Sequence, residues 1–127
     1  MSRFALMLVS LAFLTGCSGE REVGSDASGH DTAQLSAIAS DLAIQKGMSL
    51  LCDREQPDHL SYFMADLRQE SVDPAVRERI AEESVEMMNK ISTEEPEYIC
   101  TPEMFESADL RATEALIAWD EMRGITQ

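Results

Sequence analysis

Residues 31–52 read DTAQLSAIASDLAIQKGMSLLC, and this stretch decides the fold class. Its apolar residues recur at the i, i+3, i+4, i+7 spacing of one helical face: Leu35, Ile38, Ala39 and Leu42. Asp31 followed by Gln34 has the spacing of a capping box at a helix start. We therefore predict a helix from Asp31 to about Leu51, in which Gly47 permits close packing against a neighbour.

Three further segments show the same helical spacing. The second follows Pro57, the third opens with Asp73 as N-cap before Pro74, and the fourth opens with Thr101 before a proline and ends at Gly124. Their apolar faces are Leu60, Phe63, Met64 and Leu67; Val76, Ile80, Met87, Met88 and Ile91; and Phe105, Ala108, Ala112, Leu116 and Trp119. No run alternates with period two, so strands are not expected. The sequence predicts an all-α domain of four helices over residues 32–127.

An apolar run from Phe4 to Leu14 follows Arg3 at the N-terminus. About a dozen residues are too few to cross a bilayer as a helix, which takes about 20. The run fits the hydrophobic region of a signal peptide over residues 1–16. Leu-Thr-Gly-Cys, ending at Cys17, resembles the lipobox of bacterial lipoproteins. That resemblance implies that Cys17 is acylated and, with Ser18 next, that the product is sorted to the outer membrane. The alternative is a plain secreted protein with a chance cysteine.

Residues 17–31 lie between this cysteine and the first helix. From Ser18 the segment reads SGEREVGSDASGHD and is rich in Gly, Ser and charge. Such a composition cannot bury enough apolar surface to offset the entropy lost on ordering. We predict a flexible tether that includes His30 and lets the domain stand off the membrane.

The charge balance excludes some partners. There are 24 acidic and 10 basic side chains, a net charge of −14. Proteins bind nucleic acids through clustered Lys and Arg, so nucleic acid is not an expected partner. Anionic lipid headgroups also disfavour an acidic protein surface, so the acyl chains must anchor the protein.

Residues suited to catalysis are scarce. The two histidines are His30 and His59, and the many carboxylates stand without a nucleophile, a phosphate-binding loop or metal-ligand spacing. We therefore predict that the protein is not an enzyme and has no cofactor, metal or small-molecule substrate. His59 and the carboxylates Glu82, Glu83, Glu86, Glu94 and Glu95 are expected on exposed helix faces.

Cys52 and Cys100 remain as an even pair once Cys17 is assigned to lipid. In an oxidising compartment we predict a disulfide between them. It would close a loop of about 49 residues and contribute roughly 4 kcal/mol. A reactive thiol pair or a metal site is the alternative, although no His or further Cys lies close to either in sequence.

Methionines are frequent in the helical segments: Met48, Met64, Met87, Met88, Met104 and Met122. Methionine fills irregular gaps in cores and also lines surfaces that accept a partner helix. The sequence thus points to a binding surface.

The order of these features resembles the type II secretion pilotins (the PulS/OutS group). It runs from the lipobox and tether through QLSAIASDLAIQKGMSLLCDREQP, with Cys52, Arg54 and Pro57, to EYICTPEMFESADL, with Cys100. The resemblance implies a lipid-anchored protein that binds the C-terminal segment of an outer-membrane secretin subunit and targets it for assembly. It also implies acylation at Cys17 and the Cys52–Cys100 disulfide. The apolar helix faces suggest five residues that would line the groove for the secretin segment: Ile38, Leu42, Met87, Met88 and Ile91.

Two other functions fit these features. One is an acid-activated periplasmic chaperone of the HdeA type, since 24 carboxylates would give a strong response to pH. Those chaperones are freely soluble, however, and lack a lipid anchor. The other is a lipoprotein subunit of some other envelope complex.

Overall fold

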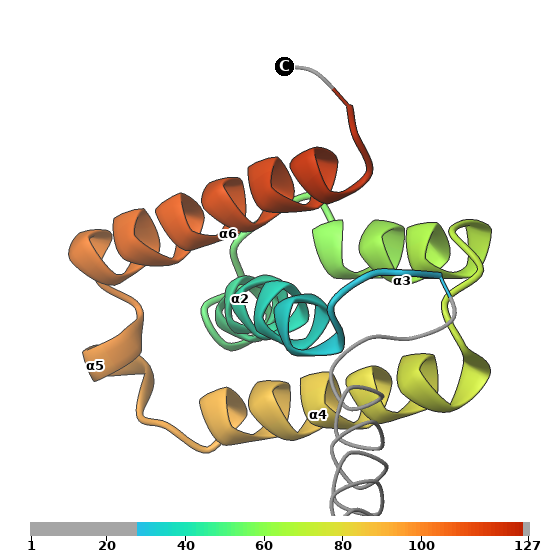
Figure 1. Cartoon of the computed structure of the whole chain (residues 1–127). Helices are drawn as coiled ribbons and strands as arrows, with labels where there is room; N and C mark the ends of the chain where they lie inside the picture. Colours follow the sequence, from blue (N-terminus) through green and yellow to red (C-terminus); the bar gives the residue numbers. More distant parts are fainter. Residues whose placement is uncertain (1–27, 126–127) are drawn as a thin grey trace, which may run out of the picture.

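A computed structural model of the chain describes residues 28–125 (Figure 1). The elements are α2 (Thr32–Leu51), α3 (His59–Gln69), α4 (Pro74–Ser92), α5 (Pro96–Ile99) and α6 (Pro102–Met122). No strand occurs between residues 28 and 125, and the prediction of an all-α domain is confirmed. The predicted signal peptide, Cys17 and most of the predicted tether lie outside the described residues.

Three of the four long helices begin where local signals predict, and α3 is the exception. Asp31 Oδ1 accepts the backbone N–H of Ala33 at 2.9 Å, and Thr101 Oγ1 accepts that of Met104 at 3.2 Å, which satisfies N–H groups that have no partner within the helix. Pro57 lies outside the helix that it was expected to begin, because Asp58 is the N-cap of α3.

Three of these helices end with the same backbone geometry. In each, the residue after the C-cap has a positive φ: Asp53 at 50°, Ser71 at 61° and Gly124 at 75°. The next N–H reaches back to a carbonyl five residues earlier: Arg54 to Ser49 at 2.9 Å, Val72 to Leu67 at 3.0 Å and Ile125 to Asp120 at 2.8 Å. This is the Schellman motif, and two of the three copies use a residue other than glycine in the left-handed region.

α2 is the central helix of the domain. In Figure 1 it is seen nearly end-on, with α6 on one side and α4 on the other, and it packs against α3 as well. The predicted apolar face of α2 is buried in full, and Phe63, Leu67, Ile80 and Trp119 complete the core from the other helices.

The predicted close packing at Gly47 is confirmed. A Cβ added at Gly47 would lie 3.1 Å from the Cβ of Ile91 on α4, closer than side chains normally approach. The bare α-carbon therefore lets α2 and α4 pack closely at this point.

The disulfide between Cys52 and Cys100 is present, with the Cα atoms 5.6 Å apart. Cys52 is the C-cap of α2 and Cys100 is the C-cap of α5, just before the N-cap of α6. The bond thus ties the end of α2 to the start of α6. The one-turn helix α5 was not predicted, so the described chain has one helix more than expected.

His30 belongs to the folded domain and not to a flexible tether. Its Nε2 lies 3.2 Å from Glu70 Oε1, and its ring meets Trp119 edge to face with centroids 5.3 Å apart. Trp119 in turn contacts Phe63 and donates from Nε1 to Asp66 at 3.0 Å. Because only 13% of the His30 side chain is exposed, the domain begins before residue 32.

Candidate partner-binding groove

An apolar groove lies between α3 and α4, which are joined by residues 70–73 and run in opposite directions across Figure 1. It encloses about 380 Å³. Six apolar residues line it: Leu60, Met64 and Ala65 from α3, and Ala81, Val85 and Met88 from α4. The remaining lining is polar: Ser61, Arg68 and Ser84. Apolar surface of this kind between two helices is suited to the apolar stripe of a third helix.

Val85 and Ala65 form the open part of this apolar surface. Val85 is 50% exposed and Ala65 is exposed as well, whereas Met64 and Met88 are half-buried. Ser84, on the floor of the groove, is buried but donates its hydroxyl hydrogen to the Ile80 carbonyl at 2.8 Å. Its polarity is therefore satisfied within α4, and the floor does not require a polar ligand.

A second hollow of about 390 Å³ lies between α2 and α4. Its α2 wall consists of small residues, and its α4 wall carries Glu83, Glu86 and Lys90. Ser36 Oγ donates to Glu83 Oε1 across it at 3.0 Å. Six of its eight lining residues are charged or carry a hydroxyl group, so the α3–α4 groove is the more apolar surface for a partner.

The five residues suggested for the groove do not share one surface. Ile38 and Leu42 are only 4% and 1% exposed and belong to the core, because α2 is covered on several sides by other helices. Met87 lines the α2–α4 hollow, Met88 lines the α3–α4 groove, and Ile91 packs at Gly47. Only Met88 lies in the groove described above.

Val85 and Ala81 were not predicted as binding residues. With Met88 they follow an i, i+4, i+7 spacing on α4, beside the stripe that contains Ile80. This second apolar stripe was the sequence signal for a further apolar surface on α4. A helix that packs against a single neighbour needs only one apolar stripe.

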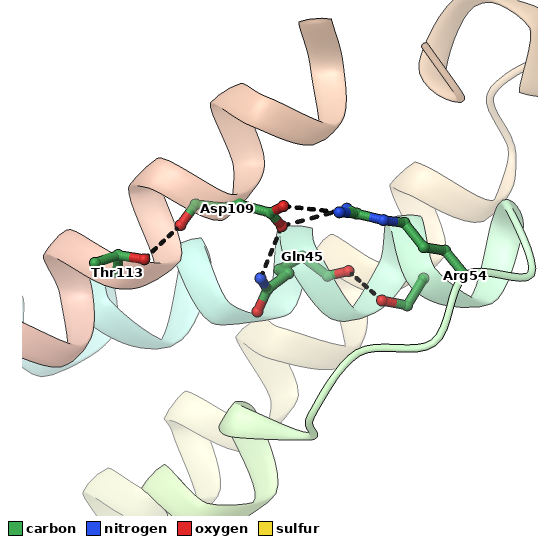
Figure 2. Close-up of polar contacts among 5 residues, drawn as sticks. Gln45, Arg54, Asp109 and Thr113 are labelled. Atoms are coloured by element: carbon green, nitrogen blue, oxygen red, sulfur yellow. Dashed lines mark hydrogen bonds and ion pairs between the residues drawn. The ribbon is translucent and has the colours of Figure 1, made fainter. Parts of the chain in front are cut away.

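A polar network joins the loop after α2 to α6 (Figure 2). Arg54 donates to both oxygens of Asp109, at 2.9 and 3.3 Å, and Gln45 Nε2 donates to Oδ1 of the same carboxylate at 3.0 Å. The Arg54 guanidinium also lies 4.4 Å from the centre of the Phe105 ring. The hydrogen bonds from Arg54, followed by that from Gln45, hold the pKa of Asp109 below its usual value in spite of partial burial.

Arg54 was noted only within the pilotin resemblance, and Gln45 and Asp109 were not predicted to interact with it. Gln45 follows Leu42 by three residues and is buried on the same face of α2. A lone polar residue on an otherwise apolar helical face was the signal for a buried hydrogen bond.

The remaining candidate residues are His59 and five carboxylates. His59 was expected to be exposed but is half-buried at the start of α3, whereas Glu82, Glu83, Glu86, Glu94 and Glu95 are exposed as predicted. Within residues 28–125 no three His, Cys, Asp or Glu side chains are placed to hold a metal ion. None of the helices in that range has the length and apolar character needed to span a membrane.

Comparison of the chain with protein-family models, with curated proteins and with solved structures found no match.

Proposed function

We propose that this chain is a lipid-anchored pilotin, which binds the C-terminal segment of a secretin subunit and carries it to the outer membrane. The observation that supports the proposal most is the open apolar groove between α3 and α4, on a helical domain closed by the Cys52–Cys100 disulfide. The lipobox-like Leu14–Cys17 would provide the lipid anchor.

The groove is suited to a segment that folds as it binds. A disordered tail loses conformational entropy when it becomes helical, so its affinity must come from burying an apolar stripe. Both walls of the groove pack on the central helix α2, and their positions are therefore set before the tail arrives. A preformed site lowers the ordering cost on the pilotin side.

The test is capture of a secretin from solubilised envelopes with the full chain as bait. We expect a secretin to be retained through its C-terminal segment and lost when that segment is deleted. Val85→Asp, which places a charge on the open part of the groove, should abolish capture. Leu110→Asp is the matched control, because Leu110 on α6 is 58% exposed and lies outside the groove lining.

Two results would contradict the proposal. Capture of many unrelated periplasmic proteins only after acid treatment would indicate a chaperone. A single membrane partner other than a secretin would indicate a subunit of a different envelope complex.

A further inference from the structure

The two edges of the α3–α4 groove differ in charge. On the α4 edge, Glu78 and Glu82 precede Val85 by seven and three residues, so all three lie on one helical face. Both carboxylates belong to exposed residues, and neither has an ion-pair partner among residues 28–125. On the α3 edge, the exposed lining residues are Ser61, Ala65 and Arg68, none of which is acidic.

Arg68 adds to this asymmetry. It lines the groove from α3, near the end where residues 70–73 connect the two helices. A helix lying in the groove would therefore meet negative charge along α4 and a positive charge near one end of α3. The two flanks of such a helix would therefore face groove edges of opposite charge.

The dimensions of the groove suit about two turns of helix. Its α3 wall extends from Leu60 to Arg68, about 12 Å at roughly 1.5 Å per residue. An apolar stripe at i, i+3 or i+4, and i+7 covers that length and would contact Met64, Val85 and Met88. Glu78 and Glu82 are one helical turn apart, so two basic residues spaced by three or four can face them together.

We propose that the groove binds a basic amphipathic helix of a partner protein, oriented with its Lys or Arg residues over Glu78 and Glu82. An acidic helix would place like charges together along α4, which disfavours it. A second copy of this chain is disfavoured as well, because each copy has a net charge of −14. The inference rests on the proposed function for the identity of the partner as a secretin segment, whereas the chemistry of the helix follows from the groove.

The test uses two labelled peptides with the same apolar stripe, one with two lysines on the flank that faces α4 and one with two glutamates there. Their affinities for the full chain are measured by fluorescence anisotropy at low salt. We expect the lysine peptide to bind about threefold to tenfold more tightly, since two exposed charge pairs contribute modestly. E78K/E82K should reverse this preference.

Two variants serve as controls. E94K/E95K changes the net charge by the same amount at exposed positions beyond the end of α4, and it should leave the lysine preference in place. Val85→Asp should lower the affinity for both peptides at least about tenfold, because it alters the apolar contact that both peptides make. Circular dichroism checks that each variant remains helical.

Equal affinity of the two peptides would overturn the inference, and so would reversal by E94K/E95K to the same extent as by E78K/E82K. A secretin tail captured equally by wild type and Val85→Asp would also overturn it, while leaving the proposed function in place. A lysine preference that E78K/E82K reverses, in a chain that captures no secretin, would support the inference and contradict the proposed function.

Discussion

Arg54 donates two hydrogen bonds to the carboxylate of Asp109, at 2.9 Å to Oδ2 and 3.3 Å to Oδ1. Arg54 lies two residues beyond Cys52, so the disulfide and this ion pair, which is drawn in Figure 2, both hold the end of α2 beside α6. Gln45 reaches the same carboxylate from within α2. The disulfide and the Asp109 carboxylate, which accepts from both Arg54 and Gln45, thus hold α6 on α2.

Asp109→Ala should lower the free energy of unfolding by about 1–2 kcal/mol. Arg54 and Gln45 both lose their hydrogen-bond acceptor, and water replaces only part of the lost hydrogen bonding. Urea denaturation measures the change. Thr113→Ala is the control, because Thr113 Oγ1 donates only to the backbone carbonyl of Asp109. That variant should remain within about 0.5 kcal/mol of the wild type.

The stabilising effect of Asp109 should depend on pH. Because hydrogen bonds from Arg54 hold the pKa of Asp109 below its usual value in the folded state, the unfolded chain binds the proton more readily. The contribution is therefore complete above the unfolded pKa, at about pH 4, and is lost as the pH falls through the lower folded pKa.

The measurement compares urea denaturation of the wild type and Asp109→Ala between pH 7 and pH 3. Other carboxyl groups are present in both proteins, so their contributions to the stability difference largely cancel. The stability difference should be constant at neutral pH and shrink below about pH 4. A difference that stays constant down to pH 3 would show that Asp109 acts through packing and not through its charge.

Gly47→Ala should destabilise the domain although alanine favours helix by about 1 kcal/mol. The added methyl group would lie 3.1 Å from Ile91 Cβ, and overpacking of this kind costs about 1–3 kcal/mol. In an Ile91→Ala background the cost should be smaller, because the two γ-carbons 3.3 Å away are removed, although the Cβ contact remains. A double-mutant cycle measures the coupling, and additive effects of the two changes would contradict close packing at this site.

The disulfide should contribute a large share of the stability. C52S/C100S opens a loop with a sequence separation of 48, which corresponds to about 4 kcal/mol in the chain-entropy estimate. The free energy of unfolding of this variant, measured with urea, should match that of the wild type under reducing conditions. An unchanged midpoint in reductant would mean that the packing and the Arg54–Asp109 pair hold α2 and α6 together without it.

The four long helices were predictable because each is long enough for the 3.6-residue period to mark its buried face. The four residues of α5 are too few to show a period, and the ends of α2 and α3 at Asp53 and Ser71 lack the glycine that usually signals a left-handed residue. The place of His30 depends on Trp119, 89 residues later, which no local pattern reveals.

The binding groove was harder to predict for a physical reason. Periodicity shows which face of a helix is apolar but not which neighbour covers it. Ile38 and Leu42 lie on the central helix and are covered, whereas Val85 lies in the groove that α3 and α4 leave open and is 50% exposed. Only the packing of α3 and α4 around α2 distinguishes these cases.

The central claim is that this chain brings a secretin to the outer membrane, and the most direct measurement is the amount of assembled secretin in outer-membrane fractions. Cells that lack the chain are compared with cells that carry the wild type, Val85→Asp or Leu110→Asp. Our account predicts that assembled secretin is lost without the chain and with Val85→Asp, and is restored by the wild type and Leu110→Asp. Equal amounts of assembled secretin in the outer membrane with and without the chain would contradict it.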